Sequence, residues 1–205
     1  MAMTEGYIKF NCNWEQKKIQ VQERQFVALN KVRSQLYELG LIGVYPDGIG
    51  FGNISVRNAN GKTFIITGST TGQFAKLDQS HYSLVTGYSF EKNSVSCTGL
   101  TKASAESLTH AAVYEALPEV GAVVHIHCLW LWKELLNVYP TTSAEIEYGT
   151  PEMALAIKQI VSGMKNAGEK IVVMGGHLEG ILAFGRNPEE ATAEILKIYN
   201  QFKHD

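Results

Sequence analysis

Residues 123–128 read Val-Val-His-Ile-His-Cys, an apolar and β-branched run with histidines at alternate positions. A short run of this composition is typical of a buried strand, and strand side chains alternate between two faces. His125 and His127 are therefore predicted to share one face, while Cys128 is a core residue on the other. Two buried imidazoles cost free energy unless each finds a partner. Their spacing suits two ligands of one metal ion, so this stretch predicts a sheet strand that carries part of a metal site.

A catalytic zinc site usually has three protein ligands and one open position, so a third ligand is expected. The remaining histidines are His81, His110, His177 and His204. His81 lies in a polar stretch and His204 adjoins the C-terminus, whereas His177 lies in a glycine-flanked loop between apolar strands, where scaffolds often present functional groups. We take His177 as the third ligand; the alternative is a surface turn histidine. His110 is interpreted as a packing residue.

The composition is that of an ordinary soluble protein, with 205 residues, 45% hydrophobic and 19% charged. We expect a single domain over residues 1–205. A net charge of −2 gives no reason to expect nucleic acid or a membrane surface as partner. No apolar stretch is long enough for a signal peptide or a membrane span, and three widely spaced cysteines suit free thiols. A cytoplasmic protein that acts on small molecules is expected.

The spacing of apolar residues predicts four helices, over 15–39, 104–117, 151–168 and 187–202. Short β-rich runs predict strands over 53–57, 63–67, 82–88, 171–174 and 181–184, in addition to the histidine strand. The last two form a β-hairpin with His177 near its tip. Hairpins argue against an all-parallel sheet. The expected fold class is α/β, with a mainly antiparallel central sheet flanked by helices on both faces.

Glu106 and His110 are four residues apart, so they share one face of a helix that leads into the histidine strand. A carboxylate near a divalent cation can act as a general acid or base, or can bind the metal until substrate displaces it. The alternative is an ordinary acidic residue in a first helical turn, where the helix dipole favours it.

Two loops rich in glycine and hydroxyl groups lie at strand ends, at Gly52-Asn53-Ile54-Ser55 and at residues 67–72, and Ser104 lies at a helix start. Backbone N–H groups, an amide and hydroxyls can together hold a phosphate with few cationic side chains, although ordinary turns share this composition. The chain has neither a P-loop nor a dinucleotide-binding glycine motif. Phosphate binding is therefore predicted without nucleotide binding.

Several motifs occur in a specific order along the chain from about residue 20 onwards. They are Gly-Asn-Ile-Ser-Val-Arg (52–57), the loop ending at Gly72, Ser104-x-Glu106-x-x-x-His110-x-x-x-Tyr114, Pro118, Val-x-His125-x-His127 and His177. This ordered set resembles the class II aldolase/adducin family, and within it most of all the fuculose-phosphate aldolases. The resemblance implies a helix-flanked, mainly antiparallel sheet, assembled as a homotetramer with active sites between subunits.

The same resemblance implies roles for particular residues. Zinc, or another divalent metal, would be bound by His125, His127 and His177, and Glu106 would be the catalytic acid/base. Gly52, Asn53, Thr71, Gly72 and Ser104 would lie around the substrate phosphate. The implied substrate is a small phosphorylated ketose, cleaved reversibly by a retro-aldol reaction through a metal-stabilised enediolate of the dihydroxyacetone phosphate type.

The chain departs from the aldolases at three places. Their Pro-Ser-Ser-Glu is Ala103-Ser104-Ala105-Glu106, which removes one hydroxyl, and their His-Gly is His177-Leu178-Glu179-Gly180, where the insertion could bring Glu179 towards the metal. A C-terminal catalytic tyrosine has no clear counterpart, Tyr199 being a poor substitute.

Two other functions stay open. A dehydratase of the methylthioribulose-phosphate type shares the histidines but takes its catalytic glutamate from the segment after the metal strand, where Glu145 and Glu147 occur. A non-catalytic, adducin-like interaction module would have lost the metal histidines, and this chain retains all three.

Overall fold

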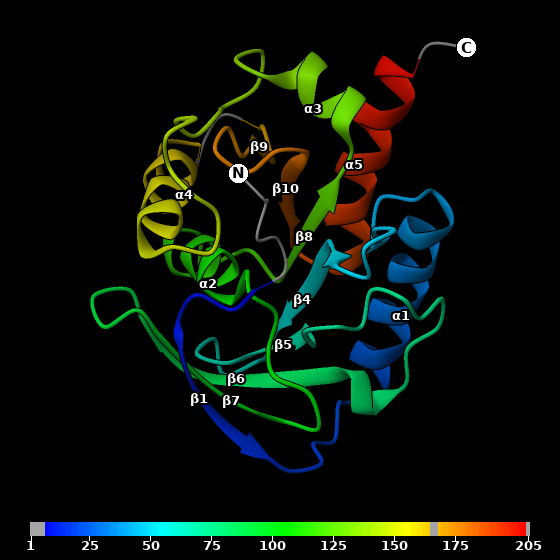
Figure 1. The fold of residues 1–205 in the computed structure, drawn as a ribbon, viewed down its shortest axis with the longest axis vertical. Coiled ribbons are helices and arrows are strands. Elements are labelled where there is room, and N and C mark those ends of the chain that lie inside the picture. Colours follow the sequence, from blue (N-terminus) through cyan, green and yellow to red (C-terminus); the bar gives the residue numbers. More distant parts are fainter. Residues whose placement is uncertain (1–6, 165–167, 204–205) are drawn as a thin grey trace.

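An eight-stranded sheet forms the centre of the computed structural model, in which residues 7–164 and 168–203 are described (Figure 1). Its strands lie in the order β1-β7-β6-β5-β4-β8-β10-β9. Their bounds are β1 (Asn11–Gln16), β4 (Asn53–Arg57), β5 (Phe64–Thr67), β6 (Tyr82–Ser89), β7 (Ser94–Gly99), β8 (Ala122–His127), β9 (Ile171–Val173) and β10 (Gly180–Gly185). Two short strands, β2 (Gly43–Val44) and β3 (Gly50–Phe51), form a separate hairpin.

Helices cover both faces of this sheet (Figure 1). One face packs against α2 (Ser107–Ala116) and α4 (Pro151–Gly163), and the other against α1 (Glu23–Glu38) and α5 (Pro188–Phe202), beside which lies α3 (Leu129–Leu135). A 3-10 turn, η1, spans Gln79–His81. Within the described residues, no helix has the length and apolar character that crossing a bilayer requires.

The alternation of side chains along β8 decides where the histidines lie. Val124 and Ile126 pack into the core towards α1 and α5, together with Cys128. Val123 packs into the opposite core, towards α2 and α4. Because residues of equal parity share a face, both histidines of β8 lie on the α2 side, at the end of the strand. The expected placement of Cys128 in the opposite core is confirmed.

The sheet differs from the expectation at one edge. Every neighbouring pair of strands is antiparallel except β1 and β7, which are parallel. The predicted helix over 15–39 was wrong at its start, because residues 11–16 form β1 and α1 begins at Glu23. Cys12 and Trp14 in β1 pack on the core at alternate positions, a period of two, whereas helical spacing begins only at Phe26.

Two other predicted helices were longer than the helices observed. The predicted helix over 104–117 begins three residues later as α2, because Ser104 and its neighbours form a turn in which the N–H and hydroxyl of Ser107 both donate to the Ser104 carbonyl. The predicted helix over 151–168 ends at Gly163, with Met164 as its cap; residues 165–167 lie outside the described part. Helix α3 was not predicted.

Candidate metal centre and active site

Three histidines come together at the end of β8. In the sheet, His125 lies opposite Asn53 of β4, and His127 lies opposite Gly180 of β10. The β9–β10 hairpin carries His177 in its loop, as the sequence predicted, and returns it beside this pair. The ring centroids lie 4.8, 5.0 and 4.7 Å apart, and the three imidazoles are buried. Their candidate ligand atoms all lie within 4.8 Å of one another.

The surroundings of His125 and His127 favour their neutral form. Burial and the neighbouring imidazoles lower the pKa of His125 and of His127 well below the ordinary range, because a charged ring would lose its hydration and repel the others. Neutral imidazole is the form that binds a metal ion. Nε2 of His125 is buried and has no hydrogen-bond partner among the described residues. A buried nitrogen without a hydrogen-bond partner costs free energy unless a cation or another ligand binds it.

The geometry fits a divalent metal ion. Two nitrogens that bind one zinc ion at about 2.1 Å each lie at most about 4.2 Å apart, so small rotations of the rings suffice. The set of mutually close ligand atoms contains no carboxylate among the described residues. Three imidazoles with room for substrate oxygens are the ligand set of a catalytic rather than a structural zinc site.

Glu106 lies beside this cluster, at the N-cap position of α2. It lines the same cavity, about 630 Å³ in volume, as the three histidines. Its Oε2 accepts a hydrogen bond of 2.7 Å from the Thr109 hydroxyl, whereas its buried Oε1 has no hydrogen-bond partner among the described residues. One oxygen is thus held in place and the other is available to a proton, a metal ion or a substrate.

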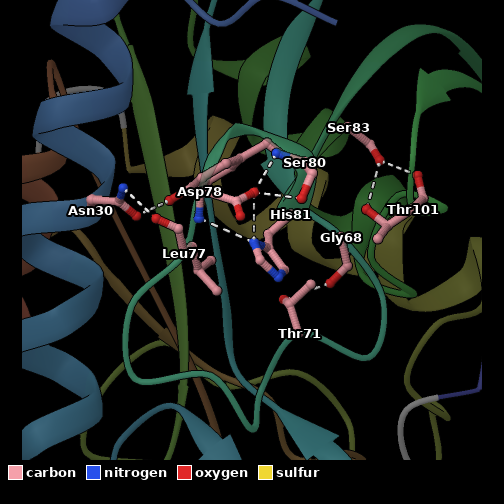
Figure 2. Close-up of polar contacts among 10 residues, drawn as sticks. Asn30, Gly68, Thr71, Leu77, Asp78, Ser80, His81, Ser83 and Thr101 are labelled. Atoms are coloured by element: carbon pink, nitrogen blue, oxygen red, sulfur yellow. Dashed lines mark hydrogen bonds and ion pairs between the residues drawn. The ribbon is translucent and has the colours of Figure 1, made fainter. Parts of the chain in front are cut away.

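The residues predicted to surround a phosphate all line this cavity. They are Gly52, Asn53, Thr71, Gly72 and Ser104. In the loop that follows β5, the Thr71 hydroxyl donates to the carbonyl of Gly68 at 2.8 Å (Figure 2). A Cβ on Gly72 would lie 2.0 Å from the carbonyl oxygen of Gly43, so only glycine permits this close approach of two backbone segments. The loop is held against the β2–β3 hairpin at the cavity wall.

Arg33 positions this loop from behind, and the sequence analysis missed it. The guanidinium is buried and donates to the carbonyls of Thr71, Gly72 and Ala75 at 3.3, 3.2 and 3.0 Å, and also to that of Phe74. None of the ion pairs formed by the described residues involves Arg33. A signal existed, because Arg33 follows Leu29 by four residues and so lies on the apolar face of α1.

This arrangement favours an anion. In a trans peptide the C=O and N–H groups point in opposite directions, so carbonyls turned towards Arg33 turn the N–H groups of Gly72 and Gln73 away from it. The positive charge of Arg33 also lies directly behind the loop. Backbone donors backed by an unpaired cation form a concave site that suits a phosphate.

The two other histidines within residues 7–203 take no part in the cluster. His81 accepts a hydrogen bond from the Asp78 N–H at 3.0 Å and closes the capping box of the η1 turn (Figure 2). His110 is fully buried, with its Nδ1 2.7 Å from the Ser55 hydroxyl. Both were expected not to be ligands. His204 lies outside the described residues.

His110 makes the fold sensitive to acid. Burial lowers its pKa from 6.5 to about 3, so below pH 6.5 the unfolded chain binds a proton that the folded chain does not. The free energy of unfolding therefore falls as the pH drops from 6.5 towards 3, by about 1.4 kcal/mol per pH unit for one proton. In metal-free protein, His110→Gln should make this slope shallower by about one proton, as measured by urea denaturation at several pH values. An unchanged slope would contradict the assignment.

The other glutamates considered as catalytic residues or metal ligands lie outside the cluster of ligand atoms. Glu147 forms an ion pair of 2.7 Å with Lys9, and its side chain is 64% exposed. Glu145 is also exposed, and neither residue lines the cavity. Glu179 accepts a hydrogen bond from the Tyr45 hydroxyl and is not part of the cluster of ligand atoms. Tyr199 packs against Trp130, away from the cavity lining.

An N-terminal segment forms part of the cavity wall. Tyr7 and Ile8 line the cavity, and the Lys9 ammonium lies 3.8 Å from the centroid of the Tyr148 ring. That ring stacks on His177, with centroids 4.4 Å apart. The segment before β1 is thereby connected to the metal-binding cluster through one aromatic ring.

The family of the chain follows from a match over most of its length. Residues 35–203 match the family described as Class II Aldolase and Adducin N-terminal domain. The chain belongs to this family. Members of the class II aldolase family are metal-dependent lyases, both aldolases and dehydratases, and the three histidines could hold the divalent metal that such enzymes use.

Solved structures of the class II aldolase family share the fold. L-fuculose-1-phosphate aldolase from Thermus thermophilus has a TM-score of 0.65 and 22% identity, with 87% of this chain and 91% of that chain covered. A sugar-phosphate aldolase from Thermotoga maritima has a TM-score of 0.56 and 18% identity, with 89% and 97% covered.

A curated relative points to a second activity within the family. Methylthioribulose-1-phosphate dehydratase from Leptospira interrogans serovar copenhageni is 33% identical over 105 residues. The match covers 48% of this chain and 42% of the relative, so it spans less than half of either protein.

Proposed function

We propose that this chain is a zinc-dependent lyase that cleaves a small phosphorylated ketose reversibly by a retro-aldol reaction. The observation that carries the proposal is one cavity that is lined by three buried histidines and by a glutamate with an oxygen left available. His125, His127 and His177 would hold the ion. When bound, it would supply Lewis-acid stabilisation of the negative charge that develops on the substrate when the carbon-carbon bond breaks.

Glu106 would move the protons. Breaking the bond requires a base that takes the proton of the hydroxyl on the departing aldehyde carbon, and an acid that returns a proton to the remaining carbon. Oε1 of Glu106 is free for both steps, while the Thr109 hydroxyl keeps the carboxylate oriented through Oε2. Such proton transfers are efficient when the carboxylate is held within hydrogen-bond reach of the reacting atoms.

The loop before Gly72 would bind the phosphate. Thr71 and Gly72 of this loop, Asn53 and Ser104 all line the cavity, and the Arg33 guanidinium, which forms no ion pair among the described residues, lies behind the loop. Fixing the phosphate would orient the reacting carbons against Glu106 and the histidines, which lowers the entropic part of the barrier. The homotetramer implied by the family resemblance stays a prediction, which sedimentation velocity checks.

A dehydratase is the second candidate. It is favoured by the identity of 33% to methylthioribulose-1-phosphate dehydratase. The same metal site would serve, since loss of water from a sugar phosphate also leaves charge on an oxygen next to the reacting carbon. The reactions are distinguished by incubating the zinc-loaded protein with dihydroxyacetone phosphate and a panel of aldehydes, and separately with ketose and thioribulose phosphates. We expect carbon-carbon bond formation or cleavage; loss of 18 mass units with no cleavage would overturn the aldolase proposal.

Glu147→Gln separates the two mechanisms at the level of one residue. Because Glu147 is exposed and paired with Lys9, we expect kcat and KM to stay within about twofold of wild type, as is usual for surface substitutions. The measurement is steady-state kinetics on the substrate found in the screen. An inactive Glu147→Gln together with an active Glu106→Gln would favour the dehydratase.

Metal analysis separates these enzymes from an adducin-like interaction module. The purified protein, dialysed against zinc and then against buffer, should retain about one divalent ion per chain. A protein that neither contains nor takes up such an ion would be a binding module rather than a lyase.

A further inference from the structure

A tyrosine bridges a metal-site histidine to a carboxylate. The Tyr45 hydroxyl lies 2.9 Å from Nδ1 of His127 and donates a hydrogen bond of 2.8 Å to Oε2 of Glu179. Tyr45 directly follows β2, and Glu179 lies two residues after His177 in the β9–β10 loop. The Tyr45 ring packs against Phe51, with centroids 4.4 Å apart. Three segments that are distant in the sequence therefore meet at one side of His127.

The number of available protons determines which atom donates in the hydrogen bond between Tyr45 and His127. A phenol carries a single proton, and here it is donated to the carboxylate of Glu179. The phenol oxygen must then accept the hydrogen bond from Nδ1–H of His127, which leaves the lone pair of this imidazole on Nε2. Metal-binding histidines commonly donate their other N–H to such a partner, which fixes the tautomer and the ring orientation.

The backbone of Glu179 adopts a conformation that is unfavourable for residues other than glycine. Its φ is +70°, a left-handed value that is uncommon for residues other than glycine and that persists where the surroundings impose it. Its carbonyl accepts a hydrogen bond of 3.0 Å from the N–H of Cys128, the residue after His127. Glu179 thus holds the end of β8 through its backbone and holds His127 through Tyr45. This residue belongs to the insertion that separates His177 from Gly180.

We propose that Tyr45 and Glu179 are positioning residues that set the zinc affinity of the site by fixing His127 as a ligand through Nε2. The inference rests on the proposed metal site and deepens it. It also assigns a purpose to the inserted residues of the hairpin loop: Glu179 acts on the metal site through a hydrogen-bonded phenol and not as a ligand.

The test measures zinc binding directly, by competition with a chromophoric chelator, in wild type, Tyr45→Phe, Glu179→Gln and the double variant. Tyr45→Phe keeps the ring that packs on Phe51 and removes only the bridging oxygen. We expect zinc affinity to fall roughly 10- to 100-fold, the effect of losing such an outer hydrogen bond. Tyr199→Phe removes a hydroxyl from a tyrosine outside the cavity and should bind zinc as wild type does.

Coupling between the two residues gives a second readout. If Glu179 acts on His127 only through the Tyr45 hydroxyl, the double variant should bind zinc no more weakly than Tyr45→Phe alone. The effects of the two substitutions would then not add. The visible absorption spectrum of the cobalt-substituted protein should change in Tyr45→Phe and not in Tyr199→Phe, because the ligand field depends on the orientation of His127. Glu179→Gln serves as the test variant if Tyr45→Phe does not fold.

The outcomes distinguish this inference from the proposed function. The wild-type protein could bind zinc while both single variants keep the same zinc affinity and cobalt spectrum. This result would overturn the positioning role of Tyr45 and Glu179 and leave the lyase proposal standing. Absence of zinc binding by the wild-type protein would overturn both.

Discussion

His125→Ala is expected to remove both the bound divalent ion and the turnover of the enzyme. The ring centroid of His125 lies 4.8 and 5.0 Å from those of the other two histidines of the cluster. Two imidazoles are one short of the three protein ligands that catalytic zinc sites use. The loss of affinity should exceed the roughly 10- to 100-fold that follows from disturbing an outer hydrogen bond, and activity should fall to background.

Metal content after dialysis, measured by mass spectrometry, and kcat/KM check this prediction together. His81→Asn is a matched control, since His81 lies outside the cluster in the η1 capping box, and it should keep one ion per chain. Circular dichroism establishes that His125→Ala is folded. A folded His125→Ala protein that still turns over substrate would refute the site.

Glu106→Gln is expected to keep the metal while kcat falls by about 10²- to 10⁴-fold, the usual contribution of a general acid or base. The amide has almost the shape of the carboxylate and can still accept the hydrogen bond from Thr109, so the wall of the cavity should be preserved. It cannot, however, take up a proton from the substrate. Binding of the phosphorylated substrate should change little, because the predicted phosphate contacts come from other residues.

Metal content, kcat and KM of Glu106→Gln separate proton transfer from binding. Glu147→Gln is the control for replacing a glutamate by glutamine, because its side chain is exposed and lies outside the cavity. Exchange of substrate hydrogen with deuterated water provides a further readout of the proton step. Retention of more than a tenth of wild-type kcat by Glu106→Gln would show that another group carries the protons.

The local periodicity of the sequence was enough to predict most of the strands and the sharing of a face by His125 and His127. Alternation along one strand follows from backbone geometry and needs no knowledge of distant residues. The predicted starts of the last two helices, at 151 and 187, agree with those of α4 and α5 to within one residue, where the Thr150 and Asn187 side chains accept hydrogen bonds from the N–H groups of Met153 and Glu190.

Other features depend on contacts that no local pattern encodes. Strand β1 alternates only weakly and lies at the edge of the sheet, so its pairing with β7 gave no clear signal before the sheet was known. Helical spacing puts Arg33 on the apolar face of α1, but it does not reveal the loop whose carbonyls the guanidinium binds. The contact of Tyr45 with Glu179 joins residues 134 positions apart, and it arises only because the hairpin loop returns to the end of β8.

The segment of Tyr7, Ile8 and Lys9 has a practical consequence for the purification of this protein. Because it borders the cavity and rests on the ring stacked against His177, an affinity tag added at the start of the chain is joined only a few residues before a wall of the cavity. Histidine-rich tags would in addition compete for the very ion under study. Kinetic comparisons between variants therefore call for protein whose leading tag has been removed by protease.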